Sequence, residues 1–162
     1  MHLNEELMLR KQLEPGHEVA LSLLLTREYL ARLFDEAIFK RESLTDQQFN
    51  VLRILKGGPP EGYLIRDIRR RMIYRNADVP RLVDRLLKQG LVERNPCEHD
   101  RRGCMVGLTV KGDKLQAKVR PLHDELCRRL DRVLSSQEQR TLVELLERLR
   151  DDYREQLAPS ER

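Results

Sequence analysis

The sequence has no tryptophan, only three phenylalanines and four tyrosines, and three cysteines among 162 residues. So few aromatic residues disfavour a β-sandwich or barrel, whose strands are rich in aromatic and β-branched side chains. Three scattered cysteines do not suggest a disulfide framework. The longest apolar run, from Val19 to Leu25, is far shorter than the roughly 20 residues of a bilayer-spanning helix. With 40% apolar and 36% charged residues, and no apolar segment of a secretory signal at the N-terminus, we expect a mainly helical cytoplasmic protein without a membrane partner.

The positive charge of the chain is concentrated in one quarter of it. Residues 63–103 contain eleven basic and six acidic side chains, whereas the rest contains twenty basic and twenty-one acidic ones. Ten of those eleven are arginines, whose planar guanidinium suits phosphates and guanine edges better than an ammonium does. A solvated helical face would also be charged, so this excess alone does not indicate a nucleic-acid partner.

Two helices are predicted before the basic segment. Apolar residues recur at helical spacing over residues 17–40, and Pro15-Gly16 is expected to close the loose segment before them. Thr45 and Gln48 have the spacing of a capping box, which predicts that the next helix starts at Thr45. The glycine- and proline-rich residues 57–62 end it. The core face of this second helix is predicted to contain Phe49, Leu52 and Leu55.

The basic segment itself predicts a helix-turn-helix. A short helix over 64–72 is followed by a turn near Tyr74-Arg75 and by a second helix, capped at Asn76 or Asp78, that runs to Gln89. Pro80 fits the first turn of that helix, and Gly90 suits the left-handed residue after it. Its inward face is predicted to contain Val79, Leu82, Val83 and Leu86. The opposite face carries Asp78, Arg81, Arg85 and Lys88.

A charged β-hairpin and two further helices complete the predicted order. Two short strands, Leu91–Cys97 and Cys104–Val110, flank a polar turn over 98–103. Ser135 and Glu138 form a second capping box before the last helix. The first of the two helices has a heptad-like apolar stripe of Leu115, Val119, Leu122, Leu126, Leu130 and Val133. The last helix carries Leu142, Leu145, Leu146, Leu149, Tyr153 and Leu157.

This arrangement favours double-stranded DNA as the partner. A helix-turn-helix inserts its second helix into the major groove, and arginines at a hairpin tip suit a narrow minor groove. Asp78 is either the cap of the second helix, which we favour, or an acceptor for a cytosine amino group. The residues predicted to contact DNA are Arg75, Asn76, Asp78, Arg81, Arg85, Arg101 and Arg102.

Two stretches resemble the MarR family of winged helix-turn-helix transcriptional regulators. They are Leu82-Val83-Asp84-Arg85-Leu86 with Gly90-Leu91-Val92, and Asp100-Arg101-Arg102-Gly103 with Val106-Gly107-Leu108-Thr109 and Lys111-Gly112. The resemblance implies a winged helix-turn-helix domain plus a helical dimerisation domain, that is, a mainly α fold with a small β-hairpin. It also implies a homodimer on an inverted repeat, a wing shaped by pairing of Asp100 with Arg102, and an unidentified small-molecule effector. The family favours a repressor over an activator, and Pro80 replaces its usual Ser or Thr.

These elements divide the chain into four predicted regions. Residues 1–16 form an N-terminal extension and 17–44 an N-terminal dimerisation helix. Residues 45–112 form the winged helix-turn-helix DNA-binding region, and 113–162 the C-terminal dimerisation helices.

Alternatives to an effector-controlled DNA-binding protein remain open at this point. Oxidation or metal binding at Cys97, His99 and Cys104 would rearrange the wing, although ordinary cytosolic thiols are the simpler interpretation. Cys127 is expected to pack beside Leu126. No phosphate loop, nucleophile motif or clustered metal ligands occur, so we predict no enzyme activity, cofactor or metal. A helical dimer whose winged module binds another protein is the remaining alternative.

Overall fold

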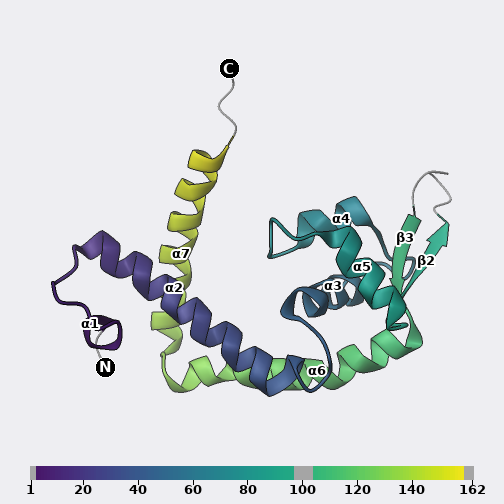
Figure 1. The fold of residues 1–162 in the computed structure, drawn as a ribbon, viewed down its shortest axis with the longest axis horizontal. Helices are drawn as coiled ribbons and strands as arrows, with labels where there is room; N and C mark the ends of the chain where they lie inside the picture. Colours follow the sequence, from purple (N-terminus) through teal and green to yellow (C-terminus); the bar gives the residue numbers. More distant parts are fainter. Residues whose placement is uncertain (1–2, 97–103, 159–162) are drawn as a thin grey trace. The chain divides into compact units, whose positions relative to one another are not determined.

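The computed structural model describes residues 3–96 and 104–158. Its helical elements are α1 (Leu3–Glu6), α2 (Pro15–Phe34), α3 (Asp46–Lys56), α4 (Ile65–Arg71), α5 (Val79–Lys88), α6 (Val110–Arg128) and α7 (Ser136–Leu157). A π-helical turn (Asp35–Phe39) follows α2, and a 3₁₀ turn (Arg129–Arg132) follows α6. The strands are β1 (Tyr63–Leu64), β2 (Val92–Pro96) and β3 (Cys104–Leu108) (Figure 1). The predicted fold class, mainly α with a small β-hairpin, is confirmed.

The chain forms two compact units, Met1–Leu122 and His123–Arg162. The first contains α1 to α5 and the sheet, and the second contains α7. In the part of the chain that the structure describes, no helix is long and apolar enough to cross a membrane.

Helix α2 begins earlier than the sequence predicted. Pro15 is its first residue, so the expectation that Pro15-Gly16 closes a loose segment is wrong. Proline suits this position because its φ is already helical and its missing N–H would have no partner there. The helix continues into the π-helical turn, whose Ile38 and Phe39 are buried.

Helix α3 is capped as its sequence predicts. The Gln48 amide donates to Thr45 Oγ1 (3.2 Å), and the Thr45 amide donates to Gln48 Oε1 (2.9 Å). These two bonds satisfy donors that would otherwise be unpaired in the first turn. The predicted core face of Phe49, Leu52 and Leu55 is buried. The ring of Phe49 also packs on that of Phe39, with 5.5 Å between centroids.

The hairpin is part of a three-stranded antiparallel sheet in the order β1-β3-β2. Strand β1, which the sequence analysis missed, pairs Tyr63 with Val106. Gly62 precedes it with φ at +88°, and a Cβ there would lie 2.0 Å from the Val106 carbonyl oxygen. Only glycine fits this position, because a side chain would meet both strain and a clash.

The two predicted strands are each too long. Strand β2 starts at Val92 rather than Leu91, and Val110 belongs to α6 rather than to β3. Thr109 separates β3 from α6: its hydroxyl accepts from the Gly112 amide (3.0 Å) and donates to the Gly90 carbonyl (2.7 Å). Thr109 therefore caps the N-terminus of α6, which begins at the next residue.

The predicted apolar stripe after Gly112 is not one continuous buried face. Val119 and Leu126 are buried, but Leu122, Leu130 and Val133 are exposed, and α6 ends at Arg128. The second capping box is confirmed, because Ser135 Oγ accepts from the Glu138 amide (3.3 Å) and the Ser135 amide donates to Glu138 Oε2 (2.7 Å). Hydrogen bonds from Ser135 lower the pKa of the Glu138 carboxyl.

Candidate nucleic-acid interface

Helix α5 separates apolar and basic side chains onto opposite faces. Its inner face is buried in the core of the first unit and consists of Val79, Leu82, Val83 and Leu86. Its outer face is exposed and carries Arg81, Arg85 and Lys88. The buried face therefore fixes the rotation of α5 about its own axis, so the side chains of Arg81, Arg85 and Lys88 point to solvent.

The N-terminus of α5 is held by a cap and by a fixed turn. Asp78 Oδ1 accepts a hydrogen bond from the Arg81 amide at 3.2 Å, which is the capping role that the sequence analysis favoured. In the turn before it, the Ile73 amide donates to Oδ1 of buried Asn50 (3.0 Å), and the Tyr74 hydroxyl donates to the Asp46 carboxylate. Helix α3 thus sets the position at which α5 begins.

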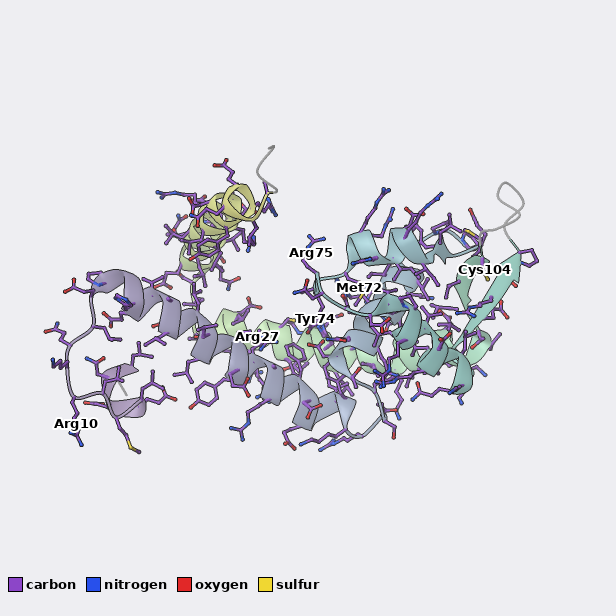
Figure 2. The ribbon with its side chains drawn as sticks, turned by 45° about the horizontal axis from the view of Figure 1, so that its top comes forward. Arg10, Arg27, Met72, Tyr74, Arg75 and Cys104 are labelled. Atoms are coloured by element: carbon purple, nitrogen blue, oxygen red, sulfur yellow. The ribbon has the colours of Figure 1, made fainter. Side chains whose placement is uncertain are left out.

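Arg75 and Asn76 extend the basic face beyond the end of α5. Both are exposed, and Arg75 Nη1 donates to the Arg70 carbonyl at 3.1 Å (Figure 2). The structure thus brings Arg75, Asn76, Asp78, Arg81 and Arg85 together on one turn and the outer face of the following helix. Their contact with DNA stays a prediction.

The C-terminus of α5 is anchored through Gln89. The side-chain Nε2 of Gln89 donates to the Ser43 carbonyl (3.2 Å), and its Oε1 accepts from Gln48 Nε2 (3.5 Å). Its backbone carbonyl accepts from Lys111 Nζ (2.7 Å). Gly90 follows in the left-handed conformation, with φ at +68°, as predicted for the residue after the helix.

Two other arginines of the basic segment have structural roles. Arg94 Nη2 on β2 lies 2.8 Å from Asp84 Oδ1 on α5, which neutralises the one acid in the middle of that helix and ties the helix to the hairpin. Arg71 stacks over the Tyr63 ring, 4.2 Å from its centroid, and donates to the Asp67 carbonyl (2.9 Å). In the sequence, Arg71 and Arg94 are simply part of the basic excess, and only the fold distinguishes them from the arginines that face solvent.

Comparisons with known proteins agree with this geometry. Residues 42–103 match the family model described as MarR family. The homoprotocatechuate degradative operon repressor of Escherichia coli is 27% identical over 129 residues, covering 80% of this chain and 85% of the repressor. Sco3205, a MarR family transcriptional regulator from Streptomyces coelicolor solved in complex with DNA, superposes with a TM-score of 0.76 at 24% identity, covering 94% of each chain.

The chain is thus similar in sequence to the MarR family over residues 42–103, and it shares the fold of MarR family regulators over most of its length. Another solved relative is Bordetella bronchiseptica BpsR, whose structure concerns regulation of DNA binding by 6-hydroxynicotinic acid. It is 25% identical with a TM-score of 0.66, covering 80% of this chain and 98% of BpsR. The family resemblance predicted from the recognition-helix and wing motifs is confirmed, and so is the winged-helix fold.

Several predicted residues of the MarR family wing lie outside the described part of the chain. They are Cys97, His99, Asp100, Arg101 and Arg102. The proposed wing pairing, the minor-groove arginines and the thiol or metal switch therefore stay predictions. Among the residues that the structure describes, no group of three His, Cys, Asp or Glu side chains could hold a metal ion.

The cysteines that the structure describes are both free. Cys104 is half-buried at the start of β3. Cys127 is exposed, so the expectation that it packs beside Leu126 is wrong for the chain taken alone. Partial burial nevertheless raises the pKa of the Cys127 thiol, which disfavours the reactive thiolate at neutral pH.

A cavity of about 460 Å³ lies behind α5, and sequence reasoning did not find it. Arg85 contributes to it. Tyr74 from the turn before α5 and Arg27 from α2 also line it (Figure 2). Its remaining lining residues are Ala31, Arg32, Asp35, Thr45, Asp46, Gln47 and Leu82. These residues come from segments far apart in the sequence, so no local motif could have indicated the cavity.

Proposed function

We propose that this chain is a transcriptional repressor that binds an inverted-repeat operator as a homodimer and releases it when a small molecule binds. The observation that carries the proposal is the outer face of α5, where Arg81 and Arg85 are exposed on a helix fixed at both ends. Rigid placement matters because base-specific hydrogen bonds require side chains to be held in register with the groove.

In this proposal α5 lies in the major groove. Arg81 and Arg85 reach guanine edges or phosphates, and Arg75 and Asn76 contact the backbone at the entrance to the groove. Arg101 and Arg102 enter the neighbouring minor groove, where negative potential favours guanidinium. Asp78 does not contact DNA in this proposal. It caps the N-terminus of α5 and so holds the first turn of the helix in place. The DNA complex of the related Sco3205 supports DNA as the partner.

Dimerisation is supported by two long helices with unusual exposure. Neither α2 nor α7 has a buried residue. Leu24 and Leu30 on α2, and Leu142 and Leu145 on α7, are each more than two fifths exposed. Large apolar side chains left exposed along a long helix are typical of protein–protein contact. A second copy of the chain is the partner that also explains an inverted repeat, because a two-fold axis relates two identical half-sites.

Effector control is proposed for the cavity behind α5. Arg85 lines the cavity and also belongs to the outer face of α5, so a ligand that binds its guanidinium competes with DNA for the same group. The affinities for ligand and for DNA are then coupled, because a ligand that binds the DNA-free dimer more tightly must weaken DNA binding. The regulation of DNA binding of BpsR by 6-hydroxynicotinic acid supports this form of control.

Selection of bound duplexes from a random DNA pool at two salt concentrations tests the proposal. We expect an enriched inverted repeat with half-sites about one helical turn apart. The double variant Arg101→Ala/Arg102→Ala is expected to bind more weakly with a shallower salt dependence, since fewer counterions are released. Equal behaviour of variant and wild type without any enriched sequence would contradict the proposal and favour a winged module that binds protein.

A further inference from the structure

The turn between α4 and α5 is held by two side chains of α3. Asn50 Oδ1 accepts from the Ile73 amide at 3.0 Å, and the Asp46 carboxylate accepts from the Tyr74 hydroxyl. Because residues four apart lie on one face of a helix, α3 presents both acceptors to the turn that precedes α5 (Figure 2). The two contacts meet consecutive residues, so they fix the backbone of that turn.

Asn50 is an unusual residue for its place in the core. It is 2% exposed, and its neighbours on α3, Phe49, Val51 and Leu52, are buried apolar residues. Its Oδ1 is directed to the Ile73 amide, whereas its Nδ2 is buried without a hydrogen-bond partner among the residues that the structure describes. A buried donor of this kind lowers the stability of the fold, because it loses its bonds to water and gains none.

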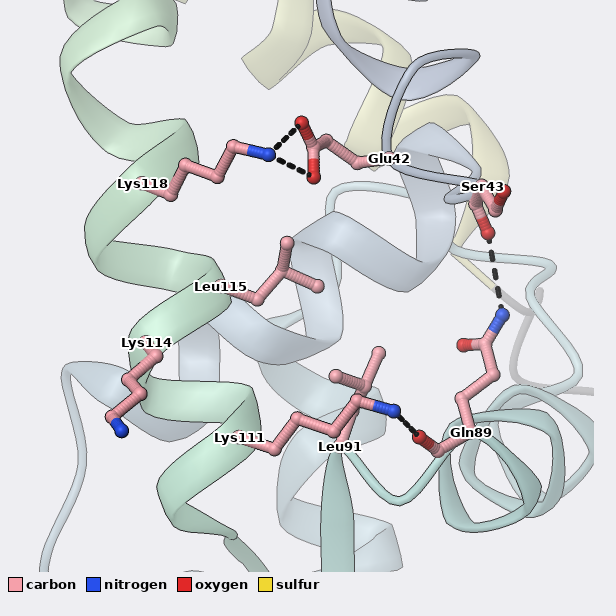
Figure 3. Close-up of a pocket in the computed structure, with 8 residues that line it drawn as sticks. All are labelled: Glu42, Ser43, Gln89, Leu91, Lys111, Lys114, Leu115 and Lys118. Atoms are coloured by element: carbon pink, nitrogen blue, oxygen red, sulfur yellow. Dashed lines mark hydrogen bonds and ion pairs between the residues drawn. The ribbon is translucent and has the colours of Figure 1, made fainter.

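Gln48, which is also buried on α3, shows the contrast. Its Oε1 accepts from the Thr45 amide (2.9 Å), and its Nε2 donates to Gln89 Oε1 (3.5 Å). Gln89 in turn donates to the Ser43 carbonyl (Figure 3). Gln48 therefore uses both ends of its amide, to cap α3 and to anchor the C-terminus of α5. Asn50 uses one end of its amide, on the turn before the N-terminus of α5.

We propose that Asn50 is a positioning residue for sequence-specific DNA binding, present at a cost in fold stability. The proposal rests on the proposed function, which places the first turn of α5 at the major groove. An apolar side chain in place of Asn50 removes the unpaired donor but releases the Ile73 amide. The turn then loosens, and α5 no longer begins at one fixed position.

Such loosening affects specific binding more than nonspecific binding. Contacts with base edges need side chains held within about 0.5 Å of their productive geometry. Nonspecific affinity comes from neutralised phosphates and tolerates movement of the basic side chains. Loss of the Asn50 bond therefore lowers the ratio of operator affinity to nonspecific affinity. A general loss of folded protein lowers both affinities by the same factor and leaves the ratio unchanged.

Hydrogen exchange on the full chain without DNA tests the bond itself. Asn50→Leu keeps the branched skeleton but has no acceptor, so we expect the Ile73 amide to exchange about tenfold faster than in wild type. Amides in the middle of α5 should keep their protection. Asn50→Asp retains an oxygen in the place of Oδ1 and should keep the Ile73 amide protected. Equal exchange at Ile73 in wild type and Asn50→Leu overturns the proposal.

Thermal unfolding tests the cost in stability. We expect Asn50→Leu to unfold at or above the wild-type midpoint, since the unpaired donor is gone, and Asn50→Asp below it, since an acidic group is buried. Gln116→Met is the matched control, because Gln116 is 3% exposed on α6 and its Oε1 is also buried without a partner among the described residues. It should unfold at or above the wild-type midpoint. A lower midpoint for Asn50→Leu than for Asn50→Asp contradicts the proposed cost.

DNA affinity is measured on the operator obtained by selection and on a scrambled duplex of the same length. We expect Asn50→Leu to lower the ratio of the two affinities about tenfold, and Asn50→Asp and Gln116→Met to keep it within about twofold. The more stable Asn50 variant then binds less specifically than the less stable one, an order that a purely structural role does not produce.

Two failures of this experiment are distinguishable. An unchanged ratio in Asn50→Leu, with wild type still preferring the operator, overturns the positioning role and leaves the proposed function intact. A wild type without preference for any sequence overturns the proposed function and the positioning role together. Exchange at Ile73 reports on the bond to Asn50 in either case.

Discussion

Asp78 lies where a single carboxylate could cap a helix or accept a hydrogen bond from DNA. Its Oδ1 accepts from the Arg81 amide, and a carboxylate used in this way also interacts favourably with the positive end of the helix dipole. The contact assigns Asp78 to the stability of α5, with an indirect effect on the position of Arg81.

Substitutions at Asp78 should separate the two roles. Asp78→Ala is expected to lower the free energy of unfolding by about 1 kcal/mol, because the cap is lost, whereas Asp78→Asn retains most of it. Denaturant titration measures this difference. Base preference in a selection experiment should be the same for Asp78→Asn and wild type. A changed preference at a cytosine would show that Asp78 reads DNA directly.

Arg81 and Arg85 are expected to dominate sequence-specific affinity. Replacing either by alanine should weaken operator binding by about tenfold or more and relax the preference at one base pair in each half-site, since a bidentate guanine contact contributes about 1–3 kcal/mol. Arg10→Ala is the matched control, because Arg10 is exposed in the segment before α2. Equal losses in all three variants, measured by fluorescence anisotropy, would mean that only overall charge matters.

At the scale of elements, the sheet depends on a close approach that only glycine allows. Gly62 enters β1 at φ +88°, and an added Cβ would meet the backbone of Val106 and Gly107. Backbone atoms cannot move aside as a flexible side chain would, so the pairing of β1 with β3 must give way.

Gly62→Ala is therefore expected to lower the free energy of unfolding by more than about 2 kcal/mol. Gly16→Ala, in the first turn of α2, meets nothing within 4 Å and should be neutral or slightly stabilising. Thermal unfolding of both variants beside wild type checks the difference. Similar midpoints for Gly62→Ala and Gly16→Ala would show that β1 contributes little to the fold.

Elements governed by local chemistry could be predicted from the sequence, and those governed by distant contacts could not. Thr45 with Gln48 and Ser135 with Glu138 determine helix starts within four residues, and both capping boxes are present. Strand β1 is two residues long, too short for an alternating pattern, and it is defined by pairing with Val106. The cavity that Arg85 lines likewise joins residues of α2, α3 and α5, which no spacing along the chain reveals.

The candidate site divides in the same way. The buried and exposed faces of α5 follow from helical periodicity, so Arg81 and Arg85 could be predicted as outward-facing. The pairing of Asp84 with Arg94 and the stacking of Arg71 on Tyr63 required the fold. Because each guanidinium has many partners within reach, sequence alone cannot separate structural arginines from those available to DNA.

At the scale of the whole molecule, the proposed function requires a dimer formed by the exposed apolar helices. Leu145→Asp on α7 should convert the dimer to a monomer, since it places a charge among apolar contacts. Light scattering after size exclusion measures the mass. Operator affinity should fall with the loss of dimer, because a monomer contacts one half-site. Thr141→Asp, at an exposed polar position of the same helix, should leave both unchanged. A Leu145→Asp protein with the mass and affinity of wild type would contradict the proposed interface.

The most direct test of the central claim is operator binding after each guanine of one half-site is replaced by 7-deazaguanine. This base pairs normally but lacks the N7 acceptor of the major groove, which arginine uses. We expect wild type to lose affinity when one or two of the guanines are replaced. We expect Arg81→Ala and Arg85→Ala each to bind equally well with and without the replacement at the guanine that the deleted side chain contacts. Unchanged wild-type binding at every guanine, or equal losses in wild type and both variants, would contradict reading of the major groove by α5.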